Sequence, residues 1–185
     1  KQILLMIAVV ALVGCGKKPA EESVLDQGRP DITKPSKPPA KTEAQIEPEA
    51  KAFTVAKAKA ETGDAEAQNS LGWMYQKGRG VEQDFKEAVK WYQKAADQGD
   101  RMAQTSLGWM YRLGQGVEQD YKEAFKWYQK SADQGLANAQ NDLGFMYAQG
   151  QGVEQDLKEA VKWYQKAADQ GLANAQNDLG FMYAQ

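Results

Sequence analysis

The fold of this chain is decided by residues 64–99, which read DAEAQNSLGWMYQKGRGVEQDFKEAVKWYQKAADQG. Apolar residues recur in this stretch at intervals of three and four, which indicates amphipathic helices. We expect a first helix over residues 65–77, ended by the glycine connector at 78–80. A second helix should start after Asp84, which opens a capping-box pattern, and end at Gly99. The stretch therefore predicts two helices joined by a tight turn.

The two-helix unit recurs with a period of 36 residues. Leu-Gly stands at 71–72, 107–108, 143–144 and 179–180, and Trp-Tyr stands at 91–92, 127–128 and 163–164. Residues 132–149 and 168–185 are identical, which suggests a recent tandem duplication. We divide the array into units 64–99, 100–135 and 136–171 and a partial unit 172–185. Repeats of this kind bury their apolar faces only by stacking on one another.

The Trp-Tyr pair explains why the units should stack. Neighbouring residues of a helix point about 100° apart, so one aromatic packs within its hairpin and the other covers the next hairpin. The expected structural core of the repeats is Leu71, Gly72, Tyr75, Trp91, Tyr92, Leu107, Gly108, Tyr111, Trp127, Tyr128, Leu143, Gly144, Tyr147, Trp163 and Tyr164.

The pattern Ala-x-Ala-Gln-x-x-Leu-Gly-x-x-Tyr, followed by Gly-x-Gly-Val and by Trp-Tyr-x-Lys-Ala-Ala-x-Gln-Gly, resembles the Sel1-like repeat, a relative of the tetratricopeptide repeat. The resemblance covers residues 64–185, about two thirds of the chain. The chain differs from the tetratricopeptide pattern in its period and in having Gln68 where that pattern has a tryptophan. The resemblance implies an all-α fold, a right-handed α-α superhelix of helix-turn-helix repeats, used as an adaptor or scaffold without general enzymatic activity.

Residues 1–14 have the layout of a secretory signal peptide, because Lys1 precedes an apolar run that is too short to span a bilayer. Leu12-Val13-Gly14-Cys15 resembles the lipobox of bacterial lipoproteins, which implies lipid attachment at Cys15. Gly16, rather than Asp, follows the cysteine, and this resemblance favours the outer membrane, with the domain facing the periplasm. The alternatives are an uncleaved anchor and an incidental thiol.

Residues 15–49 are predicted to form a disordered tether, because they hold all six prolines among charged residues and few apolar ones. Residues 50–63 align with a second helix when Gly63 is set on Gly99, with small residues in place of the Trp-Tyr pair. We therefore expect an N-terminal capping helix. At the other end, residue 185 would close a first helix that has no second helix to cover it, so we expect the sequence to be truncated there. The alternative is a natural end that docks onto a partner chain.

Composition excludes several function classes. The net charge is −2 without a basic face, which argues against nucleic acid as a partner. The chain has no histidine, the commonest general base and transition-metal ligand. The Glu82-Gln83-Asp84 stretch could suggest a carboxylate metal site, but its recurrence in each unit favours a structural cap. We expect no enzyme activity, cofactor, metal or small-molecule substrate.

A candidate binding face lies on the first helices. Positions 66, 69, 70, 73, 76 and 77 vary between units and share one helix face, while position 73 stays aromatic. The candidate residues are Glu66, Asn69, Ser70, Trp73, Gln76, Lys77, Met102, Thr105, Trp109, Arg112, Asn141, Asp142, Phe145 and Phe181. Two alternatives remain, an idle solvated face and aromatics that pack between repeats.

These patterns predict a membrane-tethered scaffold of the cell envelope that binds another protein or a peptide through the first-helix face. One alternative is a structural or regulatory envelope lipoprotein without a specific groove. Another is the binding part of a longer enzyme whose active domain lies beyond Gln185.

Overall fold

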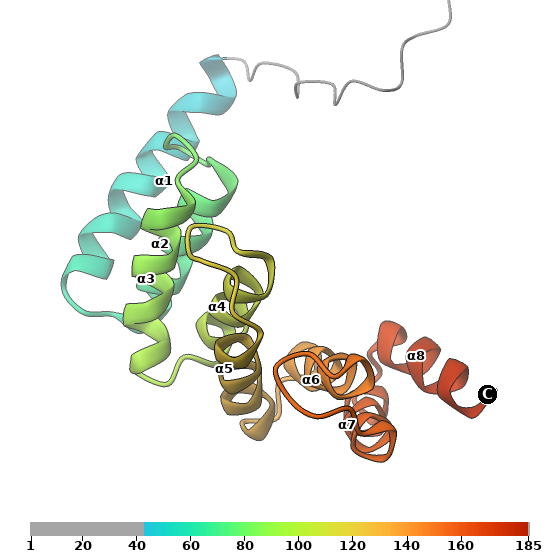
Figure 1. Cartoon of the computed structure of the whole chain (residues 1–185). Coiled ribbons are helices and arrows are strands. Elements are labelled where there is room, and N and C mark those ends of the chain that lie inside the picture. The colour runs from blue at the N-terminus through green and yellow to red at the C-terminus, as the bar shows by residue number, and fades with distance from the viewer. Residues whose placement is uncertain (1–42, 185) are drawn as a thin grey trace, which may run out of the picture. The chain divides into compact units, whose positions relative to one another are not determined.

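Eight helices follow one another in the computed structural model, which describes residues 43–184 (Figure 1). The predictions for the signal peptide, for Cys15 and for most of the tether lie outside the described residues. None of the helices in the described part is long and apolar enough to cross a membrane. The helices are α1 (Glu43–Glu61), α2 (Ala65–Lys77), α3 (Phe85–Asp97), α4 (Arg101–Leu113), α5 (Tyr121–Asp133), α6 (Ala137–Gln149), α7 (Leu157–Asp169) and α8 (Ala173–Tyr183).

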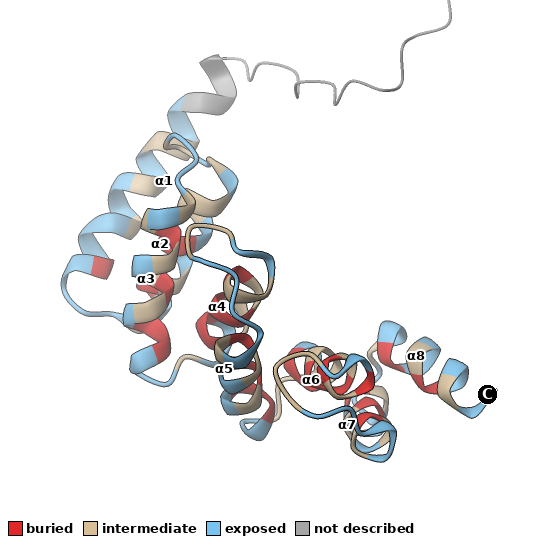
Figure 2. Ribbon diagram, in the orientation of Figure 1, coloured by how far each residue is buried: buried red, intermediate tan, exposed pale blue. Residues whose placement is uncertain are grey.

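Each helix packs mainly on its neighbours in sequence. The helices α2 and α3, α4 and α5, and α6 and α7 form three hairpins, and each second helix also packs on the first helix of the next unit. Buried positions accordingly lie along the helix contacts, whereas the outward positions are exposed (Figure 2). The described residues contain no strand, and the predicted all-α architecture of stacked hairpins is confirmed.

The Gly-x-Gly connector is required by backbone geometry. Its first glycine caps the first helix in the left-handed conformation, with φ of 67° at Gly114. Its second glycine, Gly116, has φ of 74°, and a Cβ there would lie 2.2 Å from the carbonyl oxygen of Phe85. The connector of each hairpin thus rests directly on the start of the preceding second helix, where no side chain fits.

The helix α1 takes the place of a second helix. Gly80 approaches Glu49 as Gly116 approaches Phe85, with a built Cβ again 2.2 Å from the carbonyl oxygen. Glu49 stands 36 residues before Phe85, so the register is the one expected from setting Gly63 on Gly99.

The boundary predicted for the tether is wrong within the described residues. The helix α1 begins at Glu43, so residues 43–49 are helical, and the capping helix starts before residue 50. Glu, Ala and Gln favour helix, and the Arg79 guanidinium pairs with Glu49 at 3.3 Å. Pro48 lies in the second turn, where its missing N–H removes a single backbone hydrogen bond.

Only half of the predicted capping box forms. The carboxylate of Asp84 accepts hydrogen bonds from the backbone N–H groups of Lys86 and Glu87, at 2.8 and 3.0 Å. The Glu87 side chain bonds Lys90 instead of returning to Asp84. The reason is that the Asp84 N–H already donates to the carbonyl of Tyr75 across the hairpin, at 3.0 Å.

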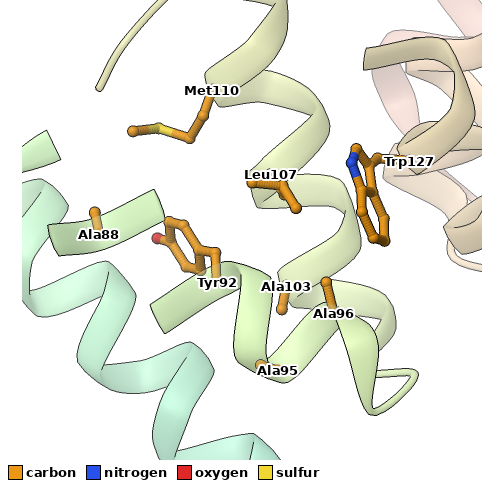
Figure 3. Packing of buried hydrophobic residues seen from close by; sticks show 8 residues of the cluster. All are labelled: Ala88, Tyr92, Ala95, Ala96, Ala103, Leu107, Met110 and Trp127. Carbon is orange, nitrogen blue, oxygen red and sulfur yellow. The ribbon is translucent and has the colours of Figure 1, made fainter. Parts of the chain in front are cut away.

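The two aromatic residues of each Trp-Tyr pair pack on different helices. The tyrosine packs on the next unit, and the tryptophan packs on the first helix of its own unit. Tyr92 lies in the cluster of Ala103, Leu107 and Met110, which belong to the next unit. Trp127 joins the same cluster from the other direction, because it packs back on its own first helix. Figure 3 shows Tyr92 and Trp127 on either side of α4, which carries Leu107.

The structure buries most of the predicted core. The leucines, glycines and tyrosines at Leu71, Gly72, Tyr92, Leu107, Gly108, Tyr128, Leu143, Gly144 and Tyr164 are buried, as is Trp127. The side chains of Tyr75, Tyr111, Tyr147, Trp91 and Trp163 are half-buried. These half-buried residues pack against the buried clusters.

A buried glutamine ties each of α2, α4 and α6 to the second-helix segments on both sides. The amide of Gln104 donates to the carbonyl of Ala96, at 3.2 Å, and its oxygen accepts from Gln134, at 2.8 Å. The same carbonyl, at the end of α3, also accepts from the backbone N–H of Gly99, at 3.0 Å. Glutamine therefore holds neighbouring units together at the position where the tetratricopeptide pattern has tryptophan.

We predict that Gly144→Ala destabilises the array whereas Gly180→Ala does not. A Cβ at Gly144 would lie 2.8 Å from Cδ1 of Tyr164 and 3.2 Å from a backbone oxygen. The described residues place nothing within 4 Å of a Cβ at Gly180, although the two glycines have identical local sequences. Urea unfolding followed by circular dichroism should show a loss of about 1–3 kcal/mol for Gly144→Ala. A gain of up to about 1 kcal/mol is expected for Gly180→Ala. Equal effects would contradict this account of the glycine.

Candidate functional site

The first helices of all four units line one cavity. This central cavity, of about 330 Å³, takes residues from α2, α4, α6 and α8. Its lining residues are Gln76, Thr105, Ser106, Trp109, Asn138, Asn141, Asp142, Leu172 and Asn174. Because consecutive first helices converge on it, the first helices form the inner face of the superhelix, and we call this surface the inner face.

Two further cavities continue the inner face toward the N-terminus. The first, of about 440 Å³, lies between α2 and α4 and is lined by Asn69, Ser70, Trp73, Met74, Tyr92, Met102 and Ser106. The second, of about 640 Å³, lies between α1 and α2 and is lined by Pro48, Lys51, Ala52, Val55, Ala56, Lys59, Asp64, Glu66, Ala67 and Ser70. All three cavities include residues of the first helices, and the α1–α2 cavity also takes six residues from α1.

Most of the predicted face residues line these cavities. They are Glu66, Asn69, Ser70, Trp73, Gln76, Met102, Thr105, Trp109, Asn141 and Asp142. Four predicted residues lie outside the three cavities. Lys77 and Phe181 are exposed, and the Arg112 guanidinium lies over the ring of Phe145, 5.7 Å from its centroid.

The predicted aromatics divide into two groups. Trp73 is 39% exposed and lies beside Met102, which is 59% exposed. Trp109 is half-buried and packs against two hydrophobic clusters, and Phe145 packs against a third. Trp109 and Phe145 therefore pack in part between repeats, as one alternative predicted. Trp73 keeps an exposed edge, although the Arg79 guanidinium lies over its ring, 5.0 Å from the centroid.

The central cavity contains one carboxyl group, that of Asp142, among residues of α4 and α6. Burial raises the pKa of Asp142 to about 6, although the charge of Arg112 acts in the opposite direction. Burial and then the charge of Asp142 raise the pKa of the Tyr128 phenol. A carboxyl group in a cavity whose pKa is raised toward neutral pH occurs both in functional sites and in structural networks.

Several residues that line the cavities were not among the predicted binding residues. Tyr92 and Leu172 were assigned to the core or to no site, yet both line a cavity. The α1 residues Val55 and Ala56 line the N-terminal cavity. The repeat alignment contains the signal, because these two small residues stand at the Trp-Tyr positions and leave room where a larger pair would fill it.

The described residues contain no group of three His, Cys, Asp or Glu side chains that could hold a metal ion. The aspartates of the Val-Glu-Gln-Asp stretches have a structural role, because Asp84, Asp120 and Asp156 each cap a helix.

A protein-family profile described as Sel1 repeat matches residues 65–100, 101–136 and 137–172. These boundaries lie one residue after the predicted ones, with the same period. A search of curated proteins gave no match.

Solved structures of two bacterial proteins are similar to this chain. The first is c5321, described as a protective antigen present in uropathogenic Escherichia coli strains displaying an SLR fold. Its sequence is 42% identical and its TM-score is 0.70, and the match covers 72% of this chain and 29% of that chain. The second is a Sel1 repeat protein from Oxalobacter formigenes, with 41% identity and a TM-score of 0.69 over 73% of this chain and 55% of that one. The chain thus spans less than two thirds of either relative.

Helicobacter pylori cysteine rich protein B shares the fold at 22% identity. Its TM-score is 0.58, over 72% of this chain and 96% of that chain.

We predict that the stability of the chain depends on pH through Asp142. A carboxyl whose pKa is raised on folding stabilises the folded state below its unfolded pKa, near 3.8, and that contribution is lost as pH rises through about 6. Asp142→Asn removes this dependence and should raise the free energy of unfolding at neutral pH by on the order of 2 kcal/mol. Urea unfolding of both proteins from pH 4 to 8 measures the difference. A difference that does not change between these pH values would contradict the raised pKa.

Proposed function

We propose that this chain, which belongs to the Sel1 repeat family, binds another protein or a peptide along its inner face. The Sel1 match confirms the resemblance drawn from the repeat pattern. Proteins of this repeat class are generally protein-interaction scaffolds and typically not enzymes. The proposal concerns the surface that this chain uses and the kind of ligand that it takes.

The observation that carries the proposal is the central cavity shared by all four first helices. A ligand lying there contacts several units at once, so its binding energy is distributed along the array. Exposed inner-face side chains such as Trp73 and Met102 can change without altering the contacts between glycine and tyrosine that join the helices. This separation between packing and surface lets a repeat protein vary its ligand on a constant fold.

The composition of the inner face suits a peptide. Trp73 and Met102 supply apolar surface at the α2–α4 cavity, and amide and hydroxyl groups line the central cavity. Aromatic anchors surrounded by adaptable hydrogen-bonding groups are typical of protein-binding surfaces. The described residues of the central cavity include a single ionisable side chain, Asp142, which argues against strongly charged ligands there.

We further propose that the chain is anchored by lipid on Cys15 and that its repeats face the periplasm from the outer membrane. The support is the Leu-Val-Gly-Cys sequence behind a short apolar run. A single acyl chain gives only reversible membrane binding, so stable anchoring requires more than one. The repeats would then meet envelope proteins rather than cytosolic ones.

We predict that photo-crosslinking in cells captures defined partners from the inner face. A photoreactive amino acid in place of Trp73 or Met102 should give a few discrete adducts, because both side chains are exposed in the α2–α4 cavity. The matched controls are the same substitution at Lys90 and Lys126, which are exposed on second helices. Mass spectrometry identifies the adducts. The same adducts from the control positions, or none from the inner face, would refute a specific groove and leave a structural lipoprotein without one as the better reading.

We predict that Cys15→Ser releases the protein from membranes. The full chain should incorporate radiolabelled palmitate and sediment with outer membranes, whereas the variant should do neither. Palmitate incorporation into the variant, or unlabelled wild-type protein, would count against lipidation at this cysteine.

A further inference from the structure

The α2–α4 cavity and the central cavity are repeat equivalents of each other. Five positions that line the first cavity recur 36 residues later in the lining of the second. The five pairs are Asn69 and Thr105, Ser70 and Ser106, Trp73 and Trp109, Met102 and Asn138, and Ser106 and Asp142. Because Ser106 lines both cavities, the two cavities adjoin on the inner face.

Each cavity has one constant side and one variable side. The preceding first helix, α2 in one case and α4 in the other, supplies a tryptophan, a serine and a small polar residue to both cavities. The following first helix supplies Met102 and Ser106 to the α2–α4 cavity, but Asn138 and Asp142 to the central cavity. A ligand group therefore meets the same wall in both cavities and different side chains beside it.

The variable residues Met102 and Asn138 are free of a packing role. Both lie in the first turn of their helices, Met102 is 59% exposed, and Asn138 is exposed as well. Met102 lines its cavity together with Trp73, so the two leave apolar surface in water at one place. The residue type at this position can therefore serve a ligand without a cost in stacking.

The α2–α4 cavity suits a large apolar side chain. In the described part of the chain, none of its seven lining residues is Asp, Glu, Lys or Arg. A charged ligand group would lose its hydration there without gaining a counter-charge. An apolar side chain instead removes the surface of Trp73 and Met102 from water, which is favourable in proportion to the area covered.

The central cavity suits a neutral side chain that donates a hydrogen bond. Burial raises the pKa of Asp142 to about 6, so its carboxyl is mostly ionised at neutral pH, accepts hydrogen bonds and repels anions. The charge of Arg112, which already acts on Asp142, disfavours a cation beside it. The carboxamide of Asn138 adds a further hydrogen-bonding group.

The two cavities are close enough for one short extended segment. The helices α2 and α4 contact each other through Gln76 and Met110, whose Nε2 and Sδ atoms are 3.7 Å apart. Packed helices lie roughly 10 Å apart, a distance that an extended chain covers in about three residues. An extended peptide also keeps its N–H and C=O groups available to the carboxamides of Asn69 and Asn138, whereas a helix uses them internally.

We infer that the inner face binds an extended peptide, with a large apolar side chain in the α2–α4 cavity and a neutral hydrogen-bond donor in the central cavity. The two peptide residues are about three positions apart, and Met102 and Asn138 select them. This inference rests on the proposed function and names the ligand chemistry at two points of that surface.

The test is a comparison of the peptides that three forms of the full chain select from a random twelve-residue library displayed on phage. The forms are wild type, Met102→Asn and Asn138→Met. Each variant carries, at an exposed position, the residue that the neighbouring unit has there, so both should melt as wild type does. Wild type should select an apolar residue and a donor residue three positions apart. Met102→Asn should lose the apolar preference, and Asn138→Met should gain a second one.

Affinities for one synthesised wild-type-selected peptide make the comparison quantitative. Replacement of its apolar residue by Asn should weaken binding to wild type at least tenfold and leave binding to Met102→Asn nearly unchanged. Replacement of its donor residue by Leu should do the same for wild type and for Asn138→Met. The control Lys126→Gln, changed at an exposed second-helix residue, should bind every peptide as wild type does.

Separate outcomes overturn the two proposals. Unchanged residue preferences in both variants, with binding lost in Trp73→Ala, would overturn the selection by Met102 and Asn138 and leave the inner face as the binding surface. A spacing of seven residues, which two helical turns give, would overturn the extended conformation. Failure to select any peptide, or selected peptides that bind Trp73→Ala and both variants as they bind wild type, would overturn both proposals.

Discussion

The structure depends on one contact, the tyrosine ring that lies against a glycine of the facing helix. Cβ atoms at Gly72, Gly108 and Gly144 would lie 2.7 to 3.0 Å from the rings of Tyr92, Tyr128 and Tyr164. No other residue allows the two helices of a hairpin to approach so closely at that point. The tyrosine then extends past its own hairpin into the core of the next unit. One contact therefore fixes both the spacing within a hairpin and the stacking between hairpins.

The same contact connects packing to the inner face. The hydroxyl groups of Tyr92 and Tyr128 lie where two successive first helices meet. The residues at those junctions therefore determine which groups surround each hydroxyl. Gln76 satisfies Tyr92, whereas the charged side chains of Arg112 and Asp142 lie beside the Tyr128 hydroxyl. The fold repeats, but the chemistry presented along the inner face does not. That difference lets identical hairpins form a surface with distinct positions.

Much of this arrangement can be predicted from the sequence, because its signals are local. The period, the connector glycines and the capping Asp84 locate the helices to within a residue or two, and helical periodicity places Trp73 away from its own hairpin. Other features depend on contacts distant in sequence. The part of α1 at Glu49 contacts Arg79 and Gly80, and the half-formed capping box depends on the Tyr75 carbonyl. The partial burial of Trp109 and Phe145 and the raised pKa of Asp142 arise only when neighbouring units stack.

The central claim is that the first helices form the binding surface. The most direct measurement is a map of amide chemical-shift changes in the full chain when a captured partner segment is added. The account predicts that the largest changes fall on α2, α4 and α6, with α3, α5 and α7 largely unaffected. Changes concentrated on the second helices would contradict it.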